Sequence, residues 1–192
     1  KAAAKELAGK HGKSLTFMAK YDEREGNSCH VHMSLRGTDG GIVFADGHNR
    51  SRVFSSFVAG VLATLREFTL LYAPSVNSYK RYQPGSFAPT AVAWGEDNRT
   101  CALRVVGHGP GLRVENRVPG GDVNPYLAQA AMLAGGLHGV RNELELEPAF
   151  TGNAYEADSA RVPSTLRAAR EAFASSELAE AAFGKDVVAH YL

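Results

Sequence analysis

The chain has 192 residues, of which 44% are hydrophobic and 21% are charged, and its formal net charge is +1. This balance is typical of a soluble globular domain and argues against a disordered chain. The small net charge excludes a global attraction to nucleic acid or to an anionic membrane, so any anion site must be local. No apolar run reaches the roughly 18 residues that a membrane-spanning helix needs.

The two cysteines, Cys29 and Cys101, have no spacing that indicates a disulfide framework or a zinc ribbon. Both lie in apolar, strand-like runs, and we expect buried thiols in a reducing compartment. The opening KAAAKELAGKHG has neither an initiator methionine nor a signal peptide. We therefore expect the chain to be part of a longer one.

The first fifty residues contain one predicted helix and several short strand candidates. Residues 1–10 have helical composition, and Gly12 is suited to end the helix. The strand candidates are residues 14–19, 28–36 and 42–45. Within residues 28–36 apolar and polar side chains alternate, so we expect His30 and His32 on one face and the apolar side chains on the other.

The rest of the chain combines predicted helices with three further strand candidates. Residues 51–71 have the apolar spacing of one long amphipathic helix, whereas the segment 82–89, YQPGSFAP, is expected to be an exposed loop. The strand candidates are residues 90–94, 101–106 and 112–118. Asn124-Pro125 is a helix-start signal, and the charged tail after Pro163 is also helical. This order predicts an α+β fold with an antiparallel sheet.

His30 and His32 form the first candidate site. Residues two apart on a strand project from the same face, roughly 6 to 7 Å apart along it. The pair would suit a metal ion or a phosphate. On spacing alone, two incidental histidines on a solvated strand explain the pattern equally well.

The motif RVENR places Glu115 between Arg113 and Arg117, so all three side chains would share one strand face. One interpretation is a structural ion-pair ladder. The other is a carboxylate that holds a cation while its arginines bind anionic groups. Further arginines that would make the site positive are Arg81, Arg99 and Arg104. Lys80 either belongs to this group or is simply exposed.

Together these residues suggest divalent-metal-assisted phosphoryl transfer, in which metals bridge phosphate oxygens and arginines neutralise developing charge. A substrate with several negative charges, such as a nucleoside triphosphate, would suit them. The chain has no Walker motif and no G-x-G-x-x-G motif, so a P-loop or Rossmann nucleotide site is not indicated.

The order of the motifs resembles the catalytic domain of the glutamine synthetase family. The matching segments are GNSCHVHMSL, NSYKRYQPGSFAP, EDNRTCALRV and RVENRVPGGDVNPYL, and the resemblance covers roughly residues 10–140. It implies a glutamine synthetase/guanido kinase-like α+β domain with a curved antiparallel sheet flanked by helices. It also implies a ligase that makes γ-glutamyl phosphate from ATP and glutamate, with Mg²⁺ or Mn²⁺ as cofactor, before ammonia or an organic amine displaces the phosphate.

The resemblance also implies roles for individual residues. The positions that match metal ligands near the transferred phosphate are His30 and Glu115. The positions that match ATP contacts are His32, Ser34, Arg99 and Arg104. The positions on the glutamate side are Gly26, Arg81, Arg99, Arg117 and the flap residue Phe87. Arg99 and Arg117 are the catalytic candidates, because arginines can stabilise a phosphoryl group in flight.

Three features depart from the family pattern. Glu25 replaces the usual asparagine in the loop before the histidines, which changes how one end of the substrate is held. The link between Arg104 and Arg113 lacks a lysine that is often found there, so one ATP contact is expected to be missing. Phe87 stands where the family has a flap glutamate that helps to deprotonate ammonium. A neutral aromatic side chain would weaken an ammonium site and favour a bulkier amine, such as a polyamine or ethanolamine.

The family resemblance implies further parts that this sequence does not show. These are an N-terminal β-grasp domain, additional metal-binding glutamates, and assembly of the full-length cytoplasmic protein into stacked-ring homo-oligomers such as dodecamers. We therefore expect residues 1–192 to be a partial catalytic domain that is inactive alone.

Three other interpretations remain open at this stage. The first is an ammonia-using glutamine synthetase with an unusual flap, and the second is a non-catalytic relative that retains the fold. The third is a nucleic-acid-binding module, which the neutral charge and the absence of an RNA-binding motif disfavour.

Overall fold

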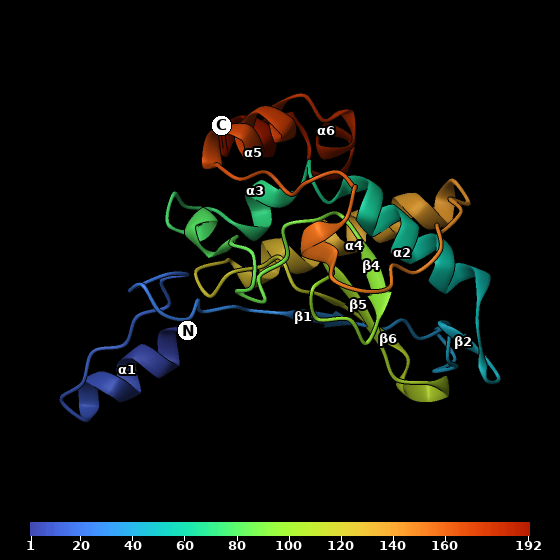
Figure 1. Cartoon of the computed structure of the whole chain (residues 1–192), viewed down its shortest axis with the longest axis horizontal. Coiled ribbons are helices and arrows are strands. Elements are labelled where there is room, and N and C mark those ends of the chain that lie inside the picture. The colour runs from blue at the N-terminus through green and yellow to red at the C-terminus, as the bar shows by residue number, and fades with distance from the viewer.

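A four-stranded sheet lies at the centre of the structure, a computed structural model that describes residues 1–192 (Figure 1). Its strands are β1 (Val31–Met33), β4 (Trp94–Glu96), β5 (Leu103–Val106) and β6 (Arg113–Asn116), in the order β1-β6-β5-β4. The β1–β6 and β5–β6 pairings are antiparallel, whereas β4 and β5 run parallel. The α+β class is confirmed, but the expectation of an antiparallel sheet is wrong for the pairing of β4 with β5.

The parallel pairing arises from the connection 97–102. Asp97 has a φ of 48°, in the left-handed region that Asp tolerates better than most residues. The side-chain oxygen of Asn98 accepts hydrogen bonds from the backbone N–H and the hydroxyl of Thr100, at 3.0 and 2.7 Å. These turns bring the chain back to the start of β4 instead of reversing it in a hairpin. Alternation of side chains predicts faces but not strand direction.

Three of the strand predictions need correction. Residues 14–19 form no strand, since their backbone runs outside the sheet without a partner ladder. The candidate at 90–94 enters the sheet only at Trp94, and the strand continues to Glu96. The candidate at 42–45 contributes only its last residue to a separate two-stranded ribbon, β2 (Ala45–Asp46) with β3 (Asn49–Arg50).

The chain forms seven α-helices. They are α1 (Ala2–Lys10), α2 (Arg52–Thr64), α3 (Thr69–Tyr72), α4 (Pro125–Arg141), α5 (Leu166–Ala174), α6 (Glu177–Phe183) and α7 (Lys185–His190). Short 3₁₀ helices are η1 (Ser78–Arg81), η2 (Gly109–Gly111) and η3 (Ala154–Glu156). The helix α1 has no buried residue and projects from the body (Figure 1). No helix combines the length and the apolar composition that a membrane crossing requires.

The predicted helix at 51–71 is two helices, because the chain turns at residues 65–68. Threonine hydroxyls bond back to main-chain carbonyls on either side of the turn, from Thr64 to Gly60 at 2.9 Å and from Thr69 to Leu65 at 2.7 Å. Such bonds bend helices. The apolar spacing continues across the break, so periodicity alone does not reveal it.

The two faces of the sheet are different. The apolar side chains of Leu103, Val105 and Val114 pack with residues of α2 and α4 into one buried cluster. The helices α2 and α4 approach closely because a Cβ on Gly60 would lie only 2.2 Å from the carbonyl oxygen of Gly135. The charged side chains of β5 and β6 therefore emerge on the opposite face.

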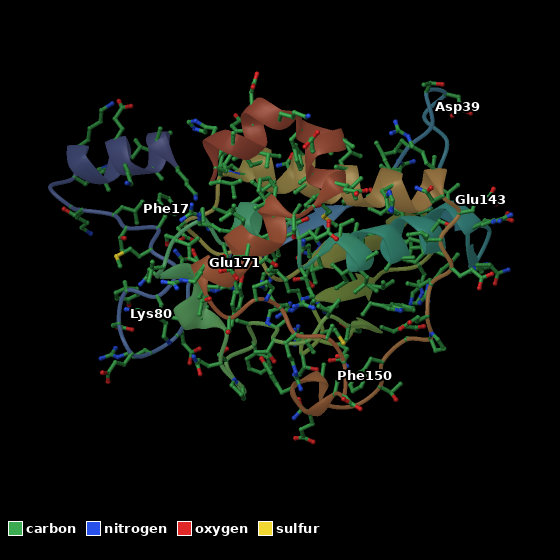
Figure 2. All side chains as sticks on the ribbon, turned by 90° about the horizontal axis from the view of Figure 1, so that it is seen from above. Phe17, Asp39, Lys80, Glu143, Phe150 and Glu171 are labelled. Atoms are coloured by element: carbon green, nitrogen blue, oxygen red, sulfur yellow. The ribbon has the colours of Figure 1, made fainter.

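The register of the strands brings three charged or polar positions into one row. Glu115 on β6 lies opposite His32 on β1 and opposite Arg104 on β5. Directly opposite residues have Cβ atoms about 4.5–5.5 Å apart. The central strand thus presents its glutamate between a histidine and an arginine. Seen from above, this central region lies between Phe17, near α1, and Asp39 at the far end (Figure 2).

Candidate active site

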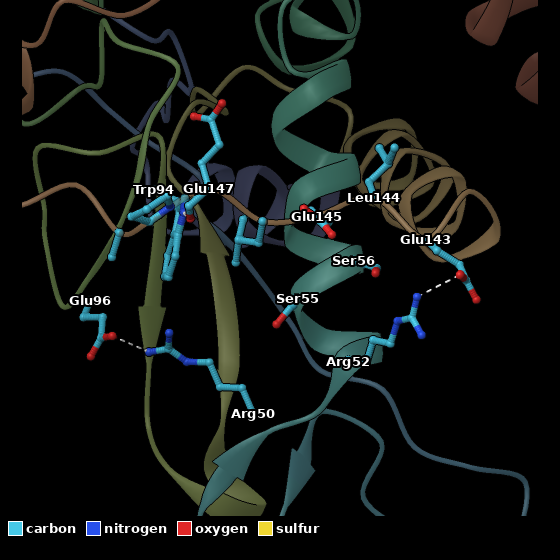
Figure 3. Close-up of a pocket in the computed structure, with 13 residues that line it drawn as sticks. Arg50, Arg52, Ser55, Ser56, Trp94, Glu96, Glu143, Leu144, Glu145 and Glu147 are labelled. Carbon is cyan, nitrogen blue, oxygen red and sulfur yellow. Dashed lines mark hydrogen bonds and ion pairs between the residues drawn. The ribbon is translucent and has the colours of Figure 1, made fainter.

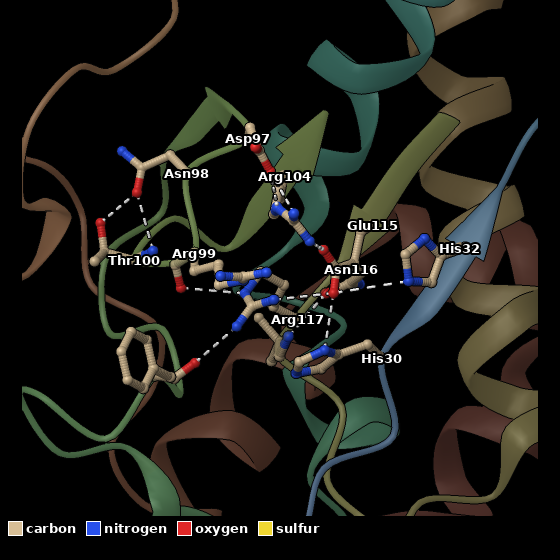
Figure 4. Close-up of polar contacts among 12 residues, drawn as sticks. His30, His32, Asp97, Asn98, Arg99, Thr100, Arg104, Glu115, Asn116 and Arg117 are labelled. Atoms are coloured by element: carbon tan, nitrogen blue, oxygen red, sulfur yellow. Dashed lines mark hydrogen bonds and ion pairs between the residues drawn. The ribbon is translucent and has the colours of Figure 1, made fainter. Parts of the chain in front are cut away.

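Glu115 is the centre of a polar cluster on the open face of the sheet (Figure 4). Its carboxylate is only 3% exposed. The Oε1 atom accepts hydrogen bonds from Nδ1 of His30 at 2.8 Å and from Nη1 of Arg117 at 2.9 Å. The Oε2 atom accepts a bond from Nη1 of Arg104 at 2.9 Å. The sequence expectation that Glu115 and Arg117 share a face with the histidines is confirmed.

These contacts determine the charge of Glu115. Burial raises the pKa of the carboxyl group, but the hydrogen bonds from His30 and Arg104 and the charge of Arg117 outweigh it. The net result is a pKa of about 2, so Glu115 is ionised throughout the physiological range. The cluster therefore holds a permanent negative charge between two arginines.

The two histidines are not equivalent. Nδ1 of His30 faces Glu115 at 2.8 Å, which leaves Nε2 as the ring nitrogen without a partner in the chain. His32 has the opposite arrangement, since its Nδ1 accepts a hydrogen bond from Nε of Arg113 at 3.3 Å and its Nε2 lies 3.7 Å from Glu115. Burial is the main cause that lowers the pKa of His32. Only His30 therefore has a ring nitrogen that no other residue of the chain contacts.

Arg117 joins the cluster to two loops. Its Nε donates to the carbonyl of Arg99 at 3.2 Å, and its Nη2 donates to the carbonyl of Phe87 at 3.3 Å. Burial lowers the pKa of this guanidinium, while the neighbouring Glu115 opposes that effect. Arg117 thus connects the buried carboxylate to the predicted flap, a contact that sequence spacing did not predict.

Arg104 has a second partner, Asp97, which the sequence analysis did not identify. The Nε of Arg104 donates to Oδ1 of Asp97 at 2.8 Å, and Nη2 contacts the same oxygen. Asp97 precedes Arg99 in the motif EDNRT, and this local clustering of charge was the available signal. The guanidinium of Arg104 is therefore held on two sides, by Asp97 and by Glu115.

The flap segment 86–88 is held by its main chain. Ser86 donates its hydroxyl to the carbonyl of Arg81 at 2.9 Å, and Tyr155 donates its hydroxyl to the carbonyl of Ala88 at 3.2 Å. Phe87 has a φ of 57° and is 60% exposed. The expectation of an exposed loop is correct at Phe87 but wrong at Ala88 and Tyr82, which are buried in the core.

A cavity of about 680 Å³ opens beside Phe87. It is lined by Phe87, Glu96, Asp97, Asn98, Arg99, Ala149, Phe150, Thr151 and Gly152. Its two acidic residues are already paired, Glu96 with Arg50 at 2.8 Å and Asp97 with Arg104. The side chain of Arg99 makes no hydrogen bond or ion pair within the chain, so its charge is available to a ligand in this cavity.

Arg81 lies deeper, beyond the flap. It is 3% exposed and donates from Nη1 to the carbonyl of Val118 at 3.1 Å. A Cβ on Gly26 would lie 2.8 Å from Cγ of Arg81, so the predicted substrate loop and this arginine are in close contact. Ser34, in contrast, is exposed outside the hydrogen-bonded cluster, and Lys80 is exposed on η1.

A second cavity, of about 610 Å³, is lined by residues that include Arg50, Trp94 and Glu143 (Figure 3). Arg50 lines one wall of this cavity. The guanidinium of Arg50 lies 5.3 Å from the ring centroid of Trp94 and 2.8 Å from the carboxylate of Glu96. Arg52 pairs with Glu143 at 2.8 Å on the other side. None of the site residues predicted from the sequence lines this cavity.

The cysteines take no part in the site. Cys101 is fully buried, and burial raises the pKa of its thiol to about 11. Cys29 is only half-buried, so the expectation of two buried thiols holds for Cys101 alone.

The donors around Glu115 fit part of a divalent-metal site. His30 offers a ring nitrogen, a common ligand for first-row transition metals, and Glu115 offers an ionised carboxylate, which suits Mg²⁺ or Mn²⁺. The chain contains no group of three or more histidine, cysteine, aspartate or glutamate side chains arranged to hold a metal ion. These two residues alone therefore do not complete a site.

Comparison with known proteins agrees with this arrangement. The profile of the family "Glutamine synthetase, catalytic domain" matches residues 1–192. The chain is 65% identical over its full length to γ-glutamylethanolamide synthetase GlnA4 of Streptomyces coelicolor. It is 44% identical, over 97% of its length, to glutamate–isopropylamine ligase of a Pseudomonas species.

A solved structure of GmaS without ligand superposes with a TM-score of 0.88 over 97% of this chain, at 31% identity. The chain spans 41% and 42% of the lengths of the two curated relatives and 44% of the GmaS chain. The family match over every residue, together with this superposition, confirms the resemblance carried by the motifs. The chain belongs to the catalytic domain of the glutamine synthetase family.

Proposed function

We propose that the protein to which this chain belongs is an ATP-dependent glutamate–amine ligase whose acceptor is a small organic amine. The observation that carries the proposal is the Glu115 cluster with Phe87 at its edge. A buried carboxylate, a histidine and several arginines form a site for phosphoryl chemistry. The flap beside it presents an exposed aromatic side chain instead of a carboxylate.

The proposed reaction has two steps. First, a γ-carboxylate oxygen of glutamate attacks the γ-phosphorus of ATP, which forms γ-glutamyl phosphate and releases ADP. Second, the amine nitrogen attacks the acyl carbon, phosphate leaves, and the nitrogen loses a proton. Arginines serve both steps, because they bind carboxylate and phosphate oxygens bidentately and stabilise charge that develops during transfer.

The chain's residues take the following roles in this proposal. His30 and Glu115 bind a divalent cation, Mg²⁺ or Mn²⁺, whose remaining ligands come from outside this chain. That cation would supply positive charge at the phosphate oxygens. The ATP-side residues are His32, Ser34, Arg99 and Arg104. The glutamate-side residues are Gly26, Arg81, Arg99 and Arg117.

Orientation of these groups follows from their contacts. Arg104 is fixed between Asp97 and Glu115, so its guanidinium is preorganised before a ligand arrives. Arg117 donates to the Phe87 carbonyl, a contact that supports a role for the flap beside the proposed phosphoryl group. The side chain of Arg99 lines the cavity at Phe87 and can reach a ligand there.

The proposed acceptor site is the cavity of about 680 Å³ beside Phe87. Phe87 and Phe150 give it apolar walls, which suit the carbon chain of an amine. The carboxylates of Glu96 and Asp97 are neutralised by arginines and offer little to a bare ammonium ion. The ethanolamide and isopropylamine relatives support an organic acceptor, and we take ethanolamine as the first amine to test.

The proposal extends to the whole protein, which we expect to be a cytoplasmic, ring-shaped homo-oligomer. Size-exclusion chromatography with light scattering tests the assembly, and a monomeric mass for the active protein would contradict it.

An amine panel tests the function. The full-length protein is incubated with ATP, Mg²⁺ or Mn²⁺, glutamate and one amine at a time, and both phosphate release and the γ-glutamyl amide are measured. We expect amide formation with ethanolamine or another small amine to exceed that with ammonia. Ammonia as the best acceptor would identify a glutamine synthetase with an unusual flap. No amide with any amine would contradict the ligase itself.

A further inference from the structure

Asp122 is a half-buried carboxylate that none of the roles above uses. Its Oδ2 atom accepts two hydroxyl hydrogen bonds, from Ser75 at 2.8 Å and from Ser78 at 2.6 Å. Its Oδ1 atom is fully buried and has no hydrogen-bond partner. A buried carboxylate oxygen without a donor is costly unless a nearby positive charge compensates it.

The nearby positive charge is Arg81. Both groups lie against Gly120, because a Cβ at that glycine would lie 2.6 Å from Oδ1 of Asp122 and 3.3 Å from Nη1 of Arg81. Burial lowers the pKa of Arg81, and the charge of Asp122 counteracts this. The carboxylate thus offsets part of the cost of burying this guanidinium without forming a direct ion pair.

The surroundings of Arg81 form a narrow slot. Gly26 packs against the aliphatic part of the side chain, and Gly120 packs against its guanidinium end. The Val118 carbonyl accepts the side chain's hydrogen bond within the chain, and the ring of Tyr82 lies 5.7 Å from its Cζ. Four of the five N–H donors of the guanidinium have no partner in the chain, and they can bind a carboxylate bidentately.

Three segments that are far apart in the sequence build this slot. Residue 27 bonds through its backbone to Ala19 and to Gly121, at 2.8 and 2.7 Å, which ties the loop of Gly26 to the loop of Asp122. The serines that hold Asp122 lie at η1 and just before it, on the segment that carries Arg81. A shift of Asp122 would therefore be transmitted to both sides of Arg81.

We propose that Asp122 is a positioning residue that holds Arg81, through its charge and its two serine contacts, in the orientation that binds the carboxylate of glutamate. The proposal rests on the glutamate-binding role of Arg81 given above. Asp122 itself touches no reacting atom. Its loss should impair glutamate binding while leaving the ATP side of the site, which is built around Glu115, unchanged.

The test compares Asp122→Asn with Asp158→Asn in the full-length protein. Asp158 is exposed and has no hydrogen bond or ion pair, so it controls for removal of one carboxylate charge. We expect Asp122→Asn to raise the KM for glutamate by about tenfold or more, since a misplacement of about 1 Å can cost on the order of 100-fold. The KM for ATP and the kcat at saturating glutamate should change less than threefold.

A merely structural role for Asp122 predicts a different result. The melting temperature and the amount of active protein would fall, and kcat would drop with no change in the KM for glutamate, which would overturn the proposal. Asp122→Glu retains the charge and should recover part of the glutamate affinity. A glutamate KM that stays normal in Asp122→Asn would exclude an electrostatic role.

A crystal structure of the Asp122→Asn protein separates this proposal from the proposed function. We expect the Arg81 guanidinium to turn away from the Val118 carbonyl, whether or not the protein is a ligase. An Arg81 that stays in place would refute the positioning role. If wild-type protein makes no amide but Arg81 moves in the variant, the ligase proposal fails and the positioning of Arg81 by Asp122 stands.

Discussion

The Glu115 cluster and the flap segment 86–88 meet at Arg117 but are built in different ways. In the cluster, side chains hold side chains, and every oxygen of the central carboxylate has a charged or imidazole donor. In the flap, carbonyl groups and one serine hydroxyl carry the contacts, and the Phe87 ring makes none of them. The difference indicates that Phe87 can be replaced without disturbing the Glu115 cluster, whereas replacement of Glu115 itself would disrupt the cluster.

This contrast suggests how related ligases can use different amines. A flap whose main chain is fixed and whose side chain is free can change its acceptor with one substitution. The buried cluster allows no comparable change, because removal of one partner leaves a charge unpaired in the interior. Substitutions in the Glu115 cluster should therefore impair activity more than substitutions in the flap.

Glu115→Gln should remove the centre of the cluster. The amide cannot balance Arg104 and Arg117, and it cannot accept all three hydrogen bonds with the same strength. We expect kcat/KM for amide formation by the full-length protein to fall on the order of 100- to 1000-fold.

The matched control for this variant is Glu143→Gln, which removes an exposed carboxylate that pairs with Arg52. The control should retain near-normal activity, as surface ion pairs contribute about 1 kcal/mol or less. Equal losses in both variants would show that the cluster has no special role.

The stability of the fold should depend on the charge of Glu115. The folded pKa of about 2 lies below the ordinary value of 4.5, so the ionised carboxylate stabilises the fold above pH 4.5. This stabilisation, about 3 kcal/mol, is lost as the pH falls from 4.5 towards 2. Urea unfolding across this range, with Glu115→Gln as reference, measures it. Identical pH slopes in the two proteins would contradict the assigned contacts.

Phe87→Glu should change the acceptor and little else. The side chain is exposed and its carbonyl, not its ring, bonds to Arg117, so we expect the unfolding free energy to change by less than about 1 kcal/mol. A carboxylate in the cavity should raise the use of ammonia relative to ethanolamine by about tenfold, because it attracts both cations but removes the apolar wall that suits the carbon chain of ethanolamine.

Phe87→Leu is the control for this substitution, because it retains an apolar wall without adding charge. It should retain the preference for the organic amine. If Leu and Glu shift the preference equally, the size of residue 87 matters and its charge does not.

Tyr155→Phe should have the smallest effect. It removes the hydroxyl that bonds to the Ala88 carbonyl and thus loosens the flap without altering the cluster. We expect a loss of about 1 kcal/mol in stability and a two- to fivefold rise in the KM for the amine. An unchanged KM for the amine would show that other contacts fix the flap.

Much of the site followed from local sequence patterns. Alternation along residues 28–36 and 113–117 predicted the shared face of His30, His32 and Glu115, since period two is a property of any strand. The family motifs then suggested roles for these positions. Helix starts such as Asn124-Pro125 were equally local, because capping depends on adjacent residues.

The other features of the site and of the sheet depend on contacts between segments that are far apart in the sequence. No sequence pattern fixes that Glu115 lies opposite both His32 and Arg104, or that β4 and β5 run parallel. The contacts of Asp97 and Asp122 were missed for the same reason, although the charged motif EDNRT had marked the neighbourhood of Asp97. Each acts on an arginine that only the folded turns bring within reach.

One competition experiment decides whether the protein prefers an organic amine to ammonia as its acceptor. The full-length protein receives ATP, glutamate and equal concentrations of ethanolamine and ammonium, and mass spectrometry quantifies both amide products. We predict that γ-glutamylethanolamide exceeds glutamine in the wild-type protein and that Phe87→Glu narrows or reverses the ratio. A wild-type product that is mainly glutamine, with a ratio unaffected by Phe87→Glu, would contradict it.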